Sequence, residues 1–125
     1  MKNKVTIHEL YVYVKSVLLK TENLETIYIG KTSNPESAES RHQKDFDKTQ
    51  VVAIGKPDII SKAENYFIKH LKADLSCIVE VDNQNEGSAG NPNANMLYVS
   101  WEVRYININQ LNEPDFNDEP FELIS

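Results

Sequence analysis

The first pattern along the chain is an alternation of aliphatic and aromatic side chains. Within residues 8–19, Leu10 and Val12 alternate with Tyr11 and Tyr13. A period of two in a stretch rich in β-branched and aromatic residues is typical of a strand, because successive side chains on a strand point to opposite faces. The sequence therefore predicts a strand over residues 8–19.

The polar stretch that follows, residues 20–25, reads as a hairpin connection, after which residues 26–30 return as a second strand. A helix-start signal comes next. Asn34 can cap free backbone amides, and Pro35 suits the first helical position, where no donor is lost. We expect a helix over residues 35–44.

Two further elements follow from apolar patterns. Residues 51–54 are short, apolar and closed by Gly55, which suits a buried strand. From Pro57 to Ala73 the chain carries the longest helical pattern, with Glu64 beside its apolar stripe. That stripe consists of Ile60, Ala63, Phe67 and Leu71.

The rest of the chain completes the fold prediction. Residues 78–81 are a strand candidate, residues 82–95 are a loop by composition, and residues 97–108 regain strand-like alternation. The order predicts an α+β fold with a small central, mostly antiparallel sheet flanked by helices. We expect one domain over residues 1–111 and an acidic tail over residues 112–125, extended over the surface or disordered.

Composition narrows the class of protein. The 125 residues are 40% hydrophobic and 26% charged, which is typical of a soluble globular domain. No apolar run is long enough for a membrane span, and the first residues lack the apolar core of a secretory signal, so we expect a cytoplasmic protein that uses no membrane. Cys77 is the only cysteine, which excludes an internal disulfide, and we expect it to be a small buried hydrophobe.

Charge is distributed unevenly. The formal net charge is -6, yet residues 1–72 carry +3 and residues 73–125 carry -9. A protein that handles nucleic acid usually has a basic face, so the net charge argues against that role. All the excess negative charge lies in residues 73–125, which weakens the argument.

Four motifs, in order along the chain, carry a family resemblance. They are Tyr11-Val12-Tyr13, Tyr28-Ile29-Gly30, Arg41 on a predicted helix and Glu64 on a later one. In this order they resemble the GIY-YIG nucleases over roughly residues 9–95, although Tyr11 stands where that family has glycine. The resemblance implies a divalent-metal-dependent endonuclease that hydrolyses phosphodiester bonds in DNA, with RNA left open, as a monomer or homodimer.

The chemistry of phosphodiester hydrolysis gives each motif a reason. Arg41 offers a planar fork of donors for a phosphate whose charge increases. Glu64 can hold Mg²⁺ (or Mn²⁺), which needs only one or two protein carboxylates. The resemblance implies that Tyr13 accepts a proton from the attacking water and that Tyr28 orients the water or the phosphate.

Further contacts to nucleic acid are predicted around these residues. Lys31 and Thr32 suit a phosphate contact at the end of the second strand, and His42 follows Arg41. The family also braces its site with an asparagine after the glutamate helix. Among the asparagines of the loop we favour Asn93 or Asn95, because they adjoin the next apolar strand.

Each candidate also has a plain structural explanation. Tyr13 can pack at the surface of the core, and Arg41 can face solvent and pair with nearby carboxylates. Glu64 can bond with Lys62 or Lys69. The alternative function is therefore a catalytically inactive module of the same fold that binds nucleic acid or protein, and a third class works through the acidic C-terminus as a mimic of nucleic acid.

Overall fold

A computed structural model describes residues 3–36, 46, 48–83, 92–104, 114–116 and 119–124. Two helices and six strands have defined bounds within these residues. In chain order they are β1 (Lys4–Val5), α1 (Ile7–Leu19), β2 (Leu24–Thr32), β3 (Lys48–Ile54), α3 (Pro57–Leu75), β4 (Glu80–Val81), β5 (Met96–Val103) and β6 (Phe121–Leu123).

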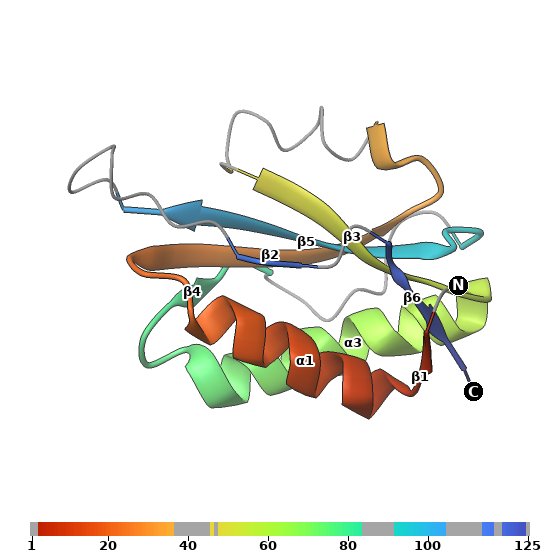
Figure 1. Ribbon diagram of the computed structural model, residues 1–125, viewed down its shortest axis with the longest axis horizontal. Helices are drawn as coiled ribbons and strands as arrows, with labels where there is room; N and C mark the ends of the chain where they lie inside the picture. Colours follow the sequence, from red (N-terminus) through yellow and green to blue (C-terminus); the bar gives the residue numbers. More distant parts are fainter. Residues whose placement is uncertain are drawn as a thin grey trace.

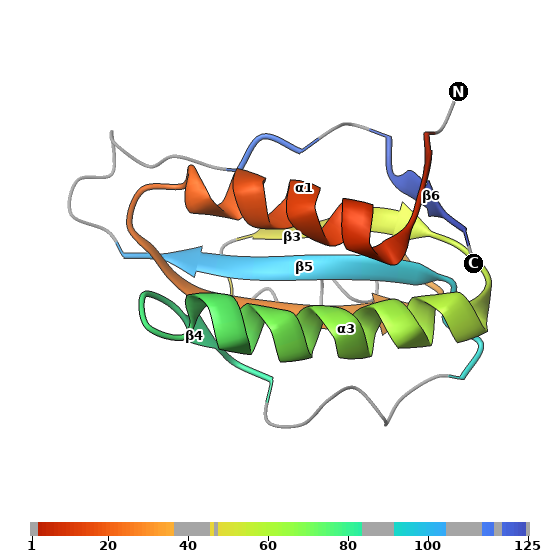
Figure 2. The same ribbon diagram turned by 90° about the horizontal axis from the view of Figure 1, so that it is seen from below.

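The strands form one mixed sheet in the order β1-β6-β3-β5-β2-β4. The long central strands β3, β5 and β2 pair antiparallel, whereas the short outer strands β1, β6 and β4 pair parallel to their neighbours. Helices α1 and α3 lie side by side against one face of the sheet (Figures 1 and 2). The prediction of an α+β fold with a sheet flanked by helices is confirmed.

The first element differs from its prediction, because residues 7–19 form α1 and no strand. A capping box starts this helix. The Glu9 amide donates to the Thr6 hydroxyl (3.2 Å), and the Thr6 amide donates to the Glu9 carboxylate (3.0 Å). The residues that α1 buries against the core recur at helical spacing and include Leu10, Val14 and Leu18. A separation of four residues suits both periods, so the alternation around Tyr11 misidentified the element.

The connection after α1 is consequently no hairpin. It joins a helix to β2, and Asn23 takes a left-handed conformation (φ 62°) at this turn, as asparagine does more readily than most residues. The later helix prediction is confirmed and extended, since α3 has Pro57 in its first turn and runs to Leu75. Pro35 and Glu36 have helical backbone where a helix over residues 35–44 was predicted, and the rest of that range lies outside the described residues.

The core lies between the two helices and the inner face of the sheet. Ile27 and Ile29 of β2 and Leu97 and Val99 of β5 are at most 1% exposed, as is Phe67 of α3. Burying one such aliphatic side chain stabilises the fold by roughly 1.5–3 kcal/mol. This packing fixes which residues of β2 and β5 point away from the helices.

The C-terminal residues are part of the sheet. β6 lies between β1 and β3, and its Leu123 is buried at 4% exposure. Phe116 packs against Trp101 in the same region. The expectation of an extended or disordered tail over residues 112–125 is therefore wrong for β6, because its three residues Phe121–Leu123 supply a strand and a core side chain.

Two smaller predictions can be assessed here. Cys77 is exposed at the turn after α3, so the expectation that it is buried is wrong; the apolar run that suggested burial includes Ile78, which is also exposed. Within the described residues no helix has the length and apolar character to cross a membrane.

Candidate functional site

Gly30 and Tyr98 define the first part of the site. β2 and β5 pair antiparallel, with Gly30 opposite Tyr98 and Tyr28 opposite Ser100. The Tyr98 ring covers Gly30 so closely that a Cβ atom on Gly30 would overlap the Cζ and Cε1 atoms of the ring and the hydroxyl oxygen. Position 30 therefore requires glycine for reasons of space, and the Tyr98 hydroxyl lies directly over the backbone of the Tyr28-Ile29-Gly30 motif.

Tyr28 and Tyr98 lie on the face of the sheet opposite the helices, because they alternate with inward-facing residues such as Ile29. Their ring centroids are 6.3 Å apart and the rings are tilted by 33°. The Phe46 ring also packs near Tyr28, with the ring centroids 5.9 Å apart. Tyr98 is 2% exposed, so its ring is fixed by packing.

Tyr13 is not part of this arrangement. It lies on α1, where its ring contacts Phe121 at 5.0 Å and Phe116 at 6.4 Å. The helices cover the other face of the sheet from Tyr28, so the sequence prediction that Tyr13 accompanies Tyr28 on a neighbouring strand does not hold. Tyr98 occupies that place: the alternation around it indicated a strand, but only the pairing of β5 with β2 puts this tyrosine beside Tyr28.

Glu64 has an unusual environment for a carboxylate. It lies on α3 at 5% exposure, and its Oε1 atom has no hydrogen-bond partner within the described residues. Burial raises the pKa of the Glu64 carboxyl from 4.5 to about 7, against the opposing effect of the Lys31 ammonium. A buried acceptor without a donor costs free energy, so this group has a capacity for a ligand that the fold does not use.

Lys31 lies next to Glu64 on the helix side of β2. Its Nζ donates a hydrogen bond to Ser61 Oγ (2.9 Å), one turn before Glu64 on α3. The ion pairs considered for Glu64 with Lys62 or Lys69 do not form, and Lys31 is the cation that influences it. Lys31 thus brings a positive charge to the same short stretch of β2 that Tyr98 covers from the opposite face.

Asn83 braces this stretch of β2. Its side chain, 8% exposed, accepts a hydrogen bond from the Ile29 amide (3.0 Å) and donates one to the Ile29 carbonyl (2.8 Å). These two bonds contact β2 two residues beyond Ile27, where its pairing with β4 ends. Asn83 was one of several loop asparagines that the sequence offered without a means of choosing among them.

The asparagines favoured from sequence lie elsewhere. Asn93 and Asn95 line a hollow of about 730 Å³ together with Ser33 and Lys56, beyond the ends of β2 and β3. Thr32, predicted to contact phosphate, is buried, and its hydroxyl donates to the Asn34 carbonyl (2.9 Å) and accepts from the Asn34 amide (3.0 Å). Its role is to fix the turn after β2.

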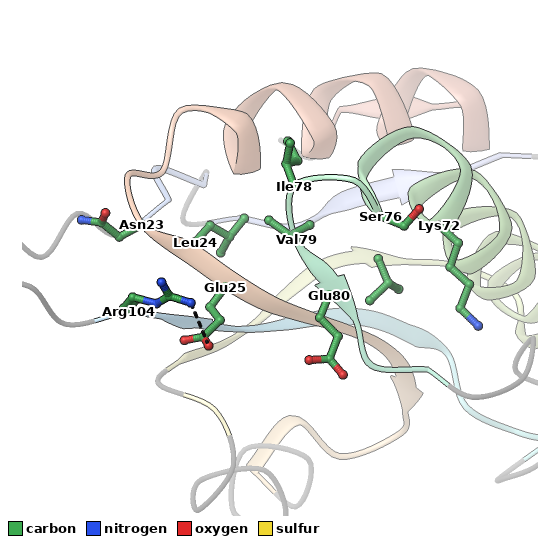
Figure 3. Close-up of a pocket in the computed structure, with 10 residues that line it drawn as sticks. Asn23, Leu24, Glu25, Lys72, Ser76, Ile78, Val79, Glu80 and Arg104 are labelled. Carbon is green, nitrogen blue, oxygen red and sulfur yellow. Dashed lines mark ion pairs between the residues drawn. The ribbon is translucent and has the colours of Figure 1, made fainter.

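Two predicted residues, Arg41 and His42, lie outside the described residues. A separate hollow of about 860 Å³ lies where α3 ends beside β2 and β4, and Lys72 and Ser76 line it from α3 (Figure 3). Arg104 pairs there with Glu25 at 3.7 Å. No residue of the Tyr28, Tyr98 and Glu64 arrangement lines this hollow.

Metal-binding clusters of three or more His, Cys, Asp or Glu side chains are absent from the part of the chain that the structure describes. A metal site at Glu64 would therefore involve fewer than three such side chains from the described residues. Comparison of the chain with protein-family models, curated proteins and solved structures finds no match.

Proposed function

We propose that this protein is a divalent-metal-dependent endonuclease that hydrolyses phosphodiester bonds in DNA, as the resemblance to GIY-YIG nucleases implies. One observation carries the proposal. Tyr98 lies on the strand beside Tyr28-Ile29-Gly30 with its hydroxyl over Gly30. It supplies the second tyrosine that the sequence assigned to Tyr13.

The substrate phosphate binds, in this proposal, at the outer edge of β2 beside Gly30 and Lys31. β4 pairs with β2 only at Thr26 and Ile27, and Asn83 covers Ile29. Among the described residues no strand covers the next two positions. Tyr98 covers this stretch from one face of the sheet, and Lys31 extends from it on the other face, where its charge acts on Glu64.

Glu64 is the residue that would hold Mg²⁺ or Mn²⁺. A hard cation accepts oxygen ligands and retains several waters, so one carboxylate suffices. The orphaned Oε1 of Glu64 fits this role, because a cation would satisfy an oxygen that has no donor among the described residues. When bound, the cation would relieve charge on the phosphate and acidify a water.

The protein side chains divide the remaining work. Water adds its oxygen to phosphorus, the bond to the leaving sugar oxygen breaks, and that oxygen takes up a proton. Tyr98 and Tyr28 orient the water through their side-chain oxygens, and one of the two, as its phenolate, accepts the proton of the water. Solvent water protonates the leaving oxygen, and the Lys31 ammonium offsets the charge that accumulates on the phosphate oxygens. Arg41 remains the predicted second phosphate donor.

The test is cleavage of supercoiled plasmid DNA by the full chain with magnesium or manganese. We expect Glu64→Gln and Arg41→Ala to abolish nicking, and Tyr98→Phe and Tyr28→Phe to reduce its rate by roughly a hundredfold or more, the usual contribution of positioned proton-transfer groups. Tyr13→Phe should leave the rate unchanged, because its ring packs on Phe121. Glu22→Gln, which neutralises an exposed carboxylate, is the matched control for Glu64.

A pure, folded protein that cleaves neither DNA nor RNA with either metal would overturn the proposal. The second candidate is then a module that binds without turnover. The raised pKa of Glu64 favours it, since a carboxyl that is partly protonated at neutral pH is a weaker metal ligand. Binding of DNA with wild-type affinity by Glu64→Gln, together with no cleavage by the wild type, would support that candidate.

A further inference from the structure

The solvent-facing side of α3 carries three lysines. At about 100° per residue, Lys62, Lys69 and Lys72 fall within roughly 80° of one another around the helix axis, on the side away from the apolar stripe. At 1.5 Å per residue they span about 15 Å along the helix. Lys62 and Lys69 are exposed and Lys72 is half-buried. We call these three residues the lysine face.

The fold does not use the charges of the lysine face. Within the described residues, Lys62, Lys69 and Lys72 take part in no ion pair and no hydrogen bond. The acid at the end of α3, Asp74, is occupied on the side facing α1, where it accepts from Tyr11 (2.5 Å) and Lys15 (3.3 Å). Asp58, exposed one turn before Lys62, lies in the same arc of the helix, so the face carries three positive charges and one negative charge.

The rest of the molecule gives this face its significance. The chain carries a net charge of -6, with -9 in residues 73–125. A polyanion is repelled by most of such a surface and attracted to a concentrated positive face. The positive surface ends at the hollow that Lys72 lines, because the carboxylates of Glu25 and Glu80 line the same hollow (Figure 3).

The lysine face leads to the candidate active site. Its N-terminal end lies beside Ser61, which accepts the hydrogen bond from Lys31. Glu64 lies on the other side of α3, about 160° around the helix axis from Lys62, and is 5% exposed. One strand of a DNA duplex advances about 3.4 Å per phosphate, so a length of about 15 Å matches four phosphates. A duplex that follows α3 would thus approach Lys31 at one end.

We propose that the lysine face is a docking surface for the phosphate backbone of duplex DNA, which it guides toward Lys31. The choice of partner rests on the proposed function. The inference itself concerns binding, which can be measured without cleavage. It predicts binding that is independent of base sequence and strongly dependent on salt, because lysine contacts to phosphate release counterions.

The experiment measures fluorescence anisotropy of a labelled DNA duplex with the full chain in EDTA, which prevents cleavage, between about 50 and 200 mM salt. Removing two phosphate contacts should lower the slope of log affinity against log salt by about 1.8. We expect this change, with at least a tenfold loss of affinity at the lower salt, for Lys62→Gln/Lys69→Gln. Adding Lys72→Gln should bring the change in slope to about 2.7.

The matched control is Lys4→Gln/Lys20→Gln, which removes two charges from exposed lysines elsewhere and should leave affinity and slope unchanged. A wild-type slope in the α3 variant, an equal loss in the control, or no DNA binding by the wild type would overturn the inference. If the α3 variant binds DNA normally and the wild type cleaves DNA, the docking role of the lysine face is rejected and the proposed nuclease activity stands. Binding through the lysine face without any cleavage would reject only the nuclease.

Discussion

The ring and hydroxyl of Tyr98 occupy the space that a side chain at Gly30 would need. The two residues face each other across β5 and β2, so the contact joins the Tyr28-Ile29-Gly30 motif to a strand more than sixty residues further along the chain. It explains the glycine of the motif by packing, and it places a phenol hydroxyl on the backbone of the proposed phosphate site. The consequences can be tested without an activity assay.

Gly30→Ala should destabilise the protein by at least about 2 kcal/mol, because a methyl group at this position overlaps a buried ring that has no room to move. Urea unfolding measures the change. Gly55→Ala is the matched control: its new Cβ would lie 3.3 Å from the Leu123 Cβ, a tight contact that a small shift relieves. An equal, small effect of both substitutions would show that Tyr98 does not fill the space above Gly30.

Asn83→Ala should lower the free energy of unfolding by about 2 kcal/mol, because it leaves the amide and carbonyl of Ile29 without partners in a buried strand. Asn95→Ala is the control, since the side chain of Asn95 is exposed and its backbone bond to Gly55 persists. Amide hydrogen exchange should accelerate at Ile29 in the first variant only. Unchanged exchange at Ile29 would contradict the bracing role of Asn83.

The helical half of the fold shows what sequence patterns can and cannot identify. α3 was predictable because its apolar stripe repeats over nearly twenty residues, and Pro57 marks its start. α1 was missed because Tyr11 and Tyr13 dominate its centre and suggest a strand, and because the spacing of Leu10, Val14 and Leu18 suits both a strand and a helix. The stronger signal was the capping box of Thr6 and Glu9. A capping box is local and could have decided the question.

The candidate site was predictable only in part, because its contacts are not local. Tyr28, Gly30 and Glu64 were identified in order along the chain. The partner of Tyr28 could not be, since strand pairing between β2 and β5 decides it, and a tyrosine within an apolar strand has no mark of function. The Lys31 and Ser61 hydrogen bond likewise depends on how α3 packs against β2.

Glu64→Gln should change how stability depends on pH. Burial raises the pKa of Glu64 from 4.5 to about 7, so the folded state holds this proton more tightly than the unfolded state does. Its favourable contribution is present below about pH 4.5 and is lost as pH rises through about 7. The melting temperature of Glu64→Gln minus that of the wild type should therefore increase between about pH 5 and pH 8, measured without metal.

Glu22→Gln serves as the comparison for this experiment, since it changes an exposed carboxylate. Magnesium added at about pH 8 should raise the melting temperature of the wild type and of Glu22→Gln, because a ligand of the folded state stabilises it. It should leave Glu64→Gln unchanged. A magnesium response in Glu64→Gln equal to that of the wild type would mean that Glu64 does not hold the cation.

Leu123→Ala tests whether the C-terminal strand belongs to the core. Leu123 is 4% exposed on β6, whereas its neighbour Ile124 is 41% exposed. Truncating the buried leucine should cost about 2–4 kcal/mol in the free energy of unfolding, because it removes apolar contacts and leaves a cavity against Gly55 and the start of α3. Ile124→Ala removes a similar number of carbons and should cost under about 1 kcal/mol. Equal losses of stability in the two variants would mean that the last residues are a solvated acidic tail and not part of the core. A larger effect of Leu123→Ala would mean that deleting residues 112–125 disrupts the sheet as well as removing the acidic residues.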